Sequence, residues 1–274
     1  GIPLVFGVSA PVESLYVHVP FCASKCSYCA FFSHEPDSNT VNRYVAALVL
    51  ELELVASELN PKTVFFGGGT PSILNLRQWE IILEAMHRLG LAAPEEWTVE
   101  CNPATLSREK ARLLRAGGVT RISMGVQSMD PDLLVRLGRV HSREMVFKSY
   151  NILREAGFER INLDLMFAIP TQTMNVWKET LREVGAMKPD HLSCYEVIYE
   201  QDTPLYEQLM AGEFDVQEEL ACDMFEELVR FTQKNGYHQY EVANFAQHQG
   251  NETFEIPDKA CLHNVNYWRG GDYH

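Results

Sequence analysis

Short β-rich runs alternate along this chain with longer segments of helical period, and this alternation constrains the fold more than any other feature. The expected strands are 15–19, 63–66, 97–100, 121–126, 161–166 and 191–195, each followed by amphipathic sequence. Strands that alternate with helices build parallel sheets from βα units. Six such units are too few to close an eight-fold barrel. The sequence therefore predicts an α/β fold in which the strands form a partial, splayed (β/α)6 barrel.

Several helices can be placed from their apolar faces and their capping residues. Apolar residues recur at intervals of three and four from 41 to 59, which predicts an amphipathic helix. Asn75 is the expected N-cap of a helix over 76–89, and another helix opens at Ser107 and stops at Gly117 and Gly118. A helix over 216–233 and a strand over 237–243 precede a polar stretch, 247–259, that is typical of a mobile loop. We therefore divide the chain into an N-terminal segment (1–14), the barrel (15–212) and a small α+β C-terminal extension (213–274).

The charge and hydropathy of the chain disfavour some classes of partner. Its 274 residues include 37 acidic and 23 basic side chains, a net charge of −14, so the overall field repels a phosphate backbone. No stretch approaches the roughly 18 uninterrupted apolar residues of a membrane span, and the N-terminus lacks the order of a signal peptide. We expect a cytoplasmic protein that binds no nucleic acid and has no membrane span.

Three of the seven cysteines lie within eight residues, directly after the first expected strand. Cys22, Cys26 and Cys29 follow the spacing C-x3-C-x2-C, which suits metal or cluster ligation better than a disulfide framework. Three thiolates on one loop can hold three irons of a cubane and leave the fourth iron open to another ligand. A zinc site with His18 or His34 as fourth ligand is the alternative, but structural zinc loops favour paired C-x2-C units and no second pair is present. The loop therefore predicts a [4Fe-4S] cluster.

Glycines and polar residues gather where the expected strands end, which is where the chemistry of such a barrel lies. A Gly-Gly-Gly-Thr-Pro run at 67–71 follows the second strand, and glycines let a ligand approach the backbone closely. Glu100, Gln127 and Asp164 end the third, fourth and fifth strands, and Arg139 follows on the next segment after Gln127. Taken singly, each is more commonly a scaffold residue or a cap. Together they suit a zwitterionic nucleoside, with carboxylates and an amide for ammonium and hydroxyl groups and a guanidinium for a carboxylate.

The segment 16–22, Tyr-Val-His-Val-Pro-Phe-Cys, together with the cysteine loop resembles the cluster motif of radical SAM proteins. Within that superfamily it is similar to the branch that contains oxygen-independent coproporphyrinogen III oxidases and the HemW heme chaperones, and the resemblance runs from Leu15 to Tyr273. It implies that S-adenosylmethionine (SAM) binds the open iron and, after one-electron reduction by an electron donor, is cleaved to methionine and a 5′-deoxyadenosyl radical. The SAM contacts that it implies are Gly68, Gly69, Thr70, Glu100, Gln127, Arg139 and Asp164, together with Tyr16, Tyr28 and Ile198.

The run 263–268, His-Asn-Val-Asn-Tyr-Trp, resembles the HNxxYW motif associated with heme binding in the HemW chaperones, and residues 269–273 continue that resemblance. A histidine with a free imidazole nitrogen can ligate heme iron, and aromatic rings offer a flat apolar surface to a macrocycle. His263, Tyr267 and Trp268 are therefore the expected heme contacts, with Cys261 and His248 as weaker candidates for the iron.

Two features separate chaperones from oxidases within this branch. The oxidases carry a further cysteine two positions after the third cluster cysteine, where this chain has Phe31, and a long N-terminal extension, where about 14 residues precede the first strand here. We therefore expect a heme chaperone that delivers heme to an acceptor protein, soluble or membrane-associated, and for which SAM cleavage is a possible activity. An oxidase that converts propionates to vinyl groups is the main rival, and the net charge speaks against a third class, enzymes that modify tRNA. Two departures from the chaperones are the longer loop at 247–259 and the end at His274, where those proteins continue into a further domain.

Overall fold

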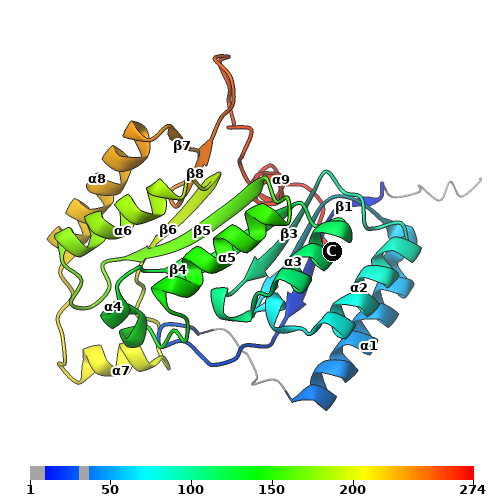
Figure 1. The fold of residues 1–274 in the computed structure, drawn as a ribbon, viewed down its shortest axis with the longest axis horizontal. Helices are drawn as coiled ribbons and strands as arrows, with labels where there is room; N and C mark the ends of the chain where they lie inside the picture. The colour runs from blue at the N-terminus through cyan, green and yellow to red at the C-terminus, as the bar shows by residue number, and fades with distance from the viewer. Residues whose placement is uncertain (1–9, 31–36) are drawn as a thin grey trace, which may run out of the picture.

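The computed structural model describes residues 10–30 and 37–274, which contain one eight-stranded sheet. Its strands are β1 (Val12–Val19), β2 (Leu59–Gly68), β3 (Glu96–Cys101), β4 (Arg121–Gln127), β5 (Arg160–Phe167), β6 (His191–Glu196), β7 (Tyr237–Gln239) and β8 (Asn244–Gln247). Their order in the sheet is β1-β2-β3-β4-β5-β6-β8-β7. The strands from β1 to β6 are parallel, while β8 and β7 add an antiparallel edge. The predicted α/β fold with a partial barrel is confirmed (Figure 1).

The helices are α1 (Ser38–Val55), α2 (Leu76–Arg88), α3 (Arg108–Ala116), α4 (Pro131–Arg136), α5 (Arg143–Glu155), α6 (Met174–Ala186), α7 (Pro204–Met210), α8 (Glu218–Lys234) and α9 (Leu262–Trp268). Most of them are arrayed along one face of the sheet, and α9 lies on the other (Figure 1). Single 3-10 turns occupy Ala56–Glu58, Pro71–Ile73 and Pro103–Thr105. Within the described part of the chain, no helix combines the length and the apolar character needed to cross a bilayer.

The predicted N-caps of α2 and α3 are confirmed. The side chain of Asn75 accepts a hydrogen bond from the backbone N–H of Gln78, whose own side chain accepts from the backbone N–H of Asn75. The Ser107 hydroxyl accepts from the backbone N–H of Lys110. Both caps satisfy donors that a helix leaves unpaired at its first turn, so the helices begin where the sequence placed them.

Alternate side chains of β3 serve the two faces of the sheet. Trp97 is fully buried on the helix side, where its ring lies 5.6 Å from Phe66, and Phe66 lies 5.7 Å from Trp79 of α2. Glu96 and Glu100 have the opposite parity and therefore face the inside of the barrel. The sheet thus has an apolar outer face beneath the helices and a polar inner face, on which the candidate sites are built.

The single strand predicted over 237–243 is wrong, because the chain turns there. The backbone N–H of Tyr240 donates to the carbonyl of Asn244 at 3.1 Å, and the N–H of Asn244 donates to Glu241 at 3.3 Å. β7 and β8 form a hairpin on either side of this turn, and β8 pairs with β6. The turn contains neither glycine nor proline, so it lacks the residues that usually mark a turn in a sequence. α8 also begins two residues later than predicted.

After β8 the chain returns to the opposite edge of the sheet, where it covers part of β1 and β2. A short parallel bridge pairs it with β1, and the N–H of Tyr16 donates to the carbonyl of His274 at 2.8 Å. α9 lies against β2. The carboxylate of Glu96, which is 1 % exposed, accepts the N–H groups of Leu262 at 3.1 Å and His263 at 3.2 Å. This carboxylate caps the start of α9 and fixes it to the inner face of the barrel.

Candidate cofactor sites

The cysteine loop follows β1 and is anchored at the carboxyl end of the sheet. The backbone N–H of Ser27 donates to the carbonyl of Leu137, just after α4, at 2.9 Å. Cys22, Cys26 and Cys29 all line one cavity, and all three are partly exposed, so their thiols are accessible. The three cysteines that the sequence singled out are therefore brought together around one hollow.

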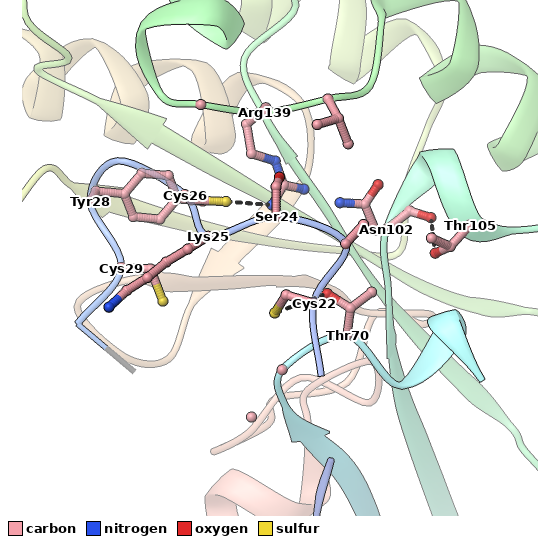
Figure 2. A pocket seen from close by; sticks show the side chains of 15 residues that line it. Cys22, Ser24, Lys25, Cys26, Tyr28, Cys29, Thr70, Asn102, Thr105 and Arg139 are labelled. Atoms are coloured by element: carbon pink, nitrogen blue, oxygen red, sulfur yellow. Dashed lines mark hydrogen bonds between the residues drawn. The ribbon is translucent and has the colours of Figure 1, made fainter. Parts of the chain in front are cut away.

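Hydrogen-bond donors lie beside two of the sulfur atoms (Figure 2). Thr70 Oγ1 is 3.6 Å from Cys22 Sγ, and Arg139 Nη1 is 3.5 Å from Cys26 Sγ. The phenol of Tyr28 lines the same cavity and also hydrogen-bonds to Cys26. Hydrogen-bond donors of this kind suit cysteine sulfurs that ligate the iron of a cluster.

This donor set fits a cubane cluster better than a single metal ion. In the part of the chain that the structure describes, no three His, Cys, Asp or Glu side chains are grouped so that they could hold one ion. A cubane distributes its cysteines over different irons, so three thiols around a shared hollow meet its requirement. The zinc alternative gains no support: His18 Nδ1 lies 3.2 Å from Tyr16 Oη, and His34 is outside the described residues.

A second cavity adjoins the first at the carboxyl ends of β2, β3, β4 and β5. Its lining includes Gly69, Thr70, Glu100, Gln127, Arg139 and Asp164, all of them residues predicted for SAM. Gly69, Thr70 and Arg139 line both cavities, so the two hollows are contiguous. Gly68 lines the first cavity and has φ +97°, a conformation that only glycine adopts without strain.

The second cavity contains two buried carboxyl groups, those of Glu100 and Asp164. Glu100 accepts the backbone N–H of Gly68 at 3.1 Å, yet burial, reinforced by the charge of Asp164, raises the pKa of Glu100 to about 8. Burial also raises the pKa of Asp164, although Asn162 Nδ2 donates to its Oδ1 at 2.8 Å. A cationic ligand would relieve both penalties, because it stabilises the ionised carboxylates.

Arg139 has a buried hydrogen-bond donor that no described residue uses. Its Nη2 donates to the carbonyl of Gly125 at 2.6 Å, whereas its buried Nε has no partner among the described residues. A carboxylate is the natural partner for such a donor. Gln127, at the end of β4, has φ 66°, a left-handed conformation that is uncommon outside glycine and often marks functional sites.

Besides Gly68, three residues predicted for SAM lie outside the second cavity. Tyr28 lines the cluster cavity instead. Tyr16 lies on the inner face of β1, where burial and the charge of Glu100 raise its pKa to about 12. Ile198 is 67 % exposed and lines a separate cavity near the start of α8, together with the buried Gln172.

Ser123 and Asn102 also line the second cavity, although the sequence did not single them out. Ser123 alternates with Gly125 and Gln127 on the inner face of β4, so the period-two pattern of the strand held the signal. Asn102 directly follows β3, two residues after Glu100. Near this cavity but not in its lining, the buried His141 has Nε2 3.0 Å from the carbonyl of Val126, and burial lowers its pKa to about 4.

A third cavity, of about 480 Å³, lies on the inner face of β1 and β2. We call it the aromatic pocket; it is lined by Tyr16, Phe65, His263, Asn264, Tyr267, Tyr273 and His274. The His263 ring lies 5.2 Å from Phe65 and 5.0 Å from Tyr273. Of the predicted heme contacts, His263 and Tyr267 line this pocket, whereas Trp268 packs beside Tyr240 at 5.9 Å.

The ring of His263 is neutral at physiological pH. Burial, reinforced by the charge of Arg121, lowers its pKa to about 4. Burial raises the pKa of the Cys261 thiol to about 12, and its Sγ lies 3.6 Å from a Glu96 oxygen, so it is held as a thiol away from the pocket. His248 stacks on Phe254 at 3.9 Å in the loop after β8. Of the three candidate iron ligands, His263 alone lines the aromatic pocket.

A partial parallel barrel with a three-cysteine loop after its first strand and a polar pocket at its carboxyl end defines a radical SAM protein. The sequence profile of the radical SAM superfamily matches residues 16–184, more than half of the chain. The chain belongs to this superfamily and, within it, to the HemW family, as its relatives show.

The heme chaperone HemW of Bacillus subtilis is 36 % identical over 268 residues, which cover 96 % of this chain and 68 % of that protein. The heme chaperone HemW of Lactococcus lactis is 35 % identical over 264 residues, covering 96 % of this chain and 67 % of the relative. The solved structure of the Escherichia coli coproporphyrinogen III oxidase HemN, a radical SAM enzyme, matches with a TM-score of 0.79 at 25 % identity. That match covers 88 % of this chain and 57 % of the oxidase. The family that the sequence predicted is confirmed.

Proposed function

We propose that this chain binds heme beside a [4Fe-4S] cluster and SAM and delivers the heme to an acceptor protein. The observation that carries the proposal is the aromatic pocket, in which several rings surround a neutral, buried histidine. Flat apolar walls and one imidazole suit a macrocycle with a central iron. The relatives named as heme chaperones support the same ligand.

In this proposal Cys22, Cys26 and Cys29 hold the cluster, and Thr70 and Arg139 donate to its cysteine sulfurs. When bound, the cluster and SAM together supply reductive cleavage of the SAM sulfonium. The chain's own contribution is to orient SAM over the cluster cavity and to keep water away from it.

Each SAM group has a matching residue in the second cavity. Arg139 Nε would meet the methionine carboxylate, and Glu100 and Asp164 the ammonium group and the ribose hydroxyls. Gly68 and Gly69 would present backbone atoms at close range. The remaining contacts would come from Thr70, Gln127 and Tyr28, whereas Tyr16 and Ile198 line other cavities and would need to move to reach SAM.

His263 and Tyr267 would contact the heme directly, and Trp268 would border it from the end of α9. The partners in this proposal are an electron donor for the cluster and a heme-acceptor protein, soluble or membrane-associated, in the cytoplasm. The net charge of −14 argues against a nucleic acid as partner.

Hemin titration tests the proposal. The protein is reconstituted anaerobically with iron and sulfide, and the Soret absorbance is followed for wild type, His263→Ala and His238→Ala, in which the replaced histidine lies exposed on β7. Wild type and His238→Ala should bind a single hemin, whereas His263→Ala should bind at least about tenfold more weakly. Transfer of the bound hemin to apomyoglobin then tests delivery. Equal binding by all three proteins would exclude the His263 site.

The fold likeness to the Escherichia coli coproporphyrinogen III oxidase supports a second candidate function, oxidative decarboxylation of propionates. Incubation with coproporphyrinogen, SAM and a reductant separates the two candidates. The chaperone proposal expects no more product than one turnover per chain. Multiple turnovers to protoporphyrinogen would replace it with the oxidase.

A further inference from the structure

The ring nitrogen Nδ1 of His263 belongs to a closed circuit of hydrogen bonds. Nδ1 lies 2.9 Å from Thr63 Oγ1, and the Thr63 hydroxyl lies 3.2 Å from Ser14 Oγ. Ser14 hydrogen-bonds to the phenol of Tyr273, which in turn donates to the carbonyl of His263 itself at 2.5 Å. Ser14, Thr63 and His263 are all at least 95 % buried, so water does not compete for the bonds among these three side chains, whereas Tyr273 is half-buried.

The direction of every bond in this circuit is fixed by the carbonyl at its end. A carbonyl oxygen only accepts hydrogen bonds, so the Tyr273 hydroxyl donates its one proton to the carbonyl of His263. The Tyr273 oxygen must then accept from Ser14, and Ser14 in turn accepts from Thr63. The Thr63 proton is now committed as well, so Thr63 Oγ1 can meet Nδ1 only as an acceptor.

It follows that Nδ1 carries the proton and that Nε2 of the neutral ring carries the lone pair. Among residues 10–30 and 37–274, Nε2 has no hydrogen-bond partner, and the ring lines the aromatic pocket. The nitrogen that a histidine uses to bind a metal is set by the hydrogen bond that its other nitrogen makes.

We infer that Thr63, Ser14 and Tyr273 are positioning residues that hold His263 as its Nδ1–H tautomer and so keep Nε2 ready to bind an iron atom in the aromatic pocket. The tautomer follows from the circuit alone, and its use toward iron rests on the proposed heme function. Asn266 of α9 also donates to Ser14 Oγ, which ties the circuit to the helix that carries His263.

NMR of the protein labelled with ¹⁵N at histidine tests the tautomer without any heme. Two-bond ¹H–¹⁵N correlations should show a protonated Nδ1 and a bare Nε2 for His263, identified by its loss in His263→Ala. Thr63→Ser keeps the acceptor and should preserve this pattern. Thr63→Val removes the acceptor, so the Nε2–H form should become populated. A protonated Nε2 in the wild type would overturn the inference.

Tyr273→Phe gives an independent variant, because it removes only the donor that fixes the direction of the circuit. The His263 signals should again show both tautomers, and an unchanged pattern would contradict the account. Hemin titration of the same proteins then tests the use of the tautomer: Thr63→Val should bind about 10- to 100-fold more weakly than Thr63→Ser. If the wild type binds no hemin while Nδ1 is protonated, the proposed function fails and the tautomer assignment stands.

Discussion

The pocket at the carboxyl ends of the strands and the aromatic pocket lie on the same inner face of the sheet but present opposite chemistry. The pocket at the carboxyl ends holds the buried carboxyl groups of Glu100 and Asp164, whose pKa values burial raises, and Arg139 Nε, which has no partner among the described residues. The aromatic pocket offers aromatic rings and a neutral histidine. Buried ionisable groups suit a charged ligand, whereas apolar rings suit a flat and weakly polar ligand. One inner face therefore carries two pockets of different chemistry.

The two pockets also differ in how the chain assembles them. The pocket at the carboxyl ends collects residues from successive strands, so it forms when the parallel sheet forms. The aromatic pocket requires contacts between residues 200 positions apart, such as Thr63 and His263. Its integrity therefore depends on how well the C-terminal segment docks onto β1 and β2.

The largest expected effect is on the cluster cavity, which adjoins the pocket at the carboxyl ends of the strands. Cys26→Ala removes a cluster ligand, so the iron content after anaerobic reconstitution should fall from about four atoms per chain to near zero. Cys222→Ala replaces an exposed cysteine on α8 and is the matched control, which should retain the cluster. Hemin binding should survive in both variants. Loss of hemin binding in Cys26→Ala would show that the two pockets are not separate.

A pH dependence of SAM binding comes next. Glu100, with a pKa of about 8, is largely protonated at pH 7 in the ligand-free protein, and a cationic ligand must displace that proton. SAM affinity should therefore rise with pH up to about 8, while hemin affinity should not follow this profile. Calorimetry in buffers of different ionisation enthalpy measures the released proton.

Glu100→Gln removes the titrating group and sharpens this test. SAM affinity should fall by about 10- to 100-fold and lose its pH profile. Because the folded pKa of Glu100 lies above its usual 4.5, the ligand-free fold loses stability as the pH rises from about 4.5 to about 8. Thermal unfolding without SAM should show the variant gaining stability relative to wild type at pH 8.5. A pH profile that persists in Glu100→Gln would exclude this carboxyl group as its origin.

A smaller effect is expected at the cap that holds α9 against the sheet. Glu96→Gln weakens the cap at the start of α9, because one neutral oxygen replaces a carboxylate that accepts from Leu262 and His263. The free energy of unfolding should drop by about 1–3 kcal/mol, and hemin affinity should drop with it. Urea denaturation followed by tryptophan fluorescence measures the loss. SAM affinity, measured where both proteins are fully folded, should stay within twofold of wild type. A larger decrease would contradict the proposed separation of the two pockets.

The smallest effect is expected at the rim of the aromatic pocket. Tyr267 is 66 % exposed and lines only this pocket, so Tyr267→Ala should weaken hemin binding by about 1 kcal/mol, a factor of about five. Tyr267→Phe retains the ring and is the matched control. If both variants weaken hemin binding equally, the Tyr267 hydroxyl contributes to binding rather than the apolar surface of its ring.

The contrast between the pockets also explains what the sequence predicted and what it did not. Period-two runs and capping residues such as Asn75 are local signals, so the six parallel strands and their helices could be placed. Carboxyl ends of neighbouring parallel strands meet at one edge, which is why Glu100, Gln127 and Asp164 were expected together. Ile198, placed by resemblance alone, lines another cavity.

The bonds around His263 have no local signal. Thr63 and Ser14 are ordinary strand residues in the sequence, and they acquire a role only when α9 docks beside them. The turn between β7 and β8 likewise depends on pairing with β6, which no window of the sequence contains. Contacts of this kind are decided by tertiary packing rather than by propensity.

Simultaneous loading with SAM and hemin tests directly whether the two ligands occupy separate pockets. The anaerobically reconstituted protein is dialysed against radiolabelled SAM while hemin is added, and bound SAM and hemin are counted in the same sample. The account predicts that one SAM and one hemin occupy each chain together, and that His263→Ala loses only the hemin. Displacement of SAM by hemin in equal amounts would mean that both ligands use one site, and the separation of the two pockets would be wrong.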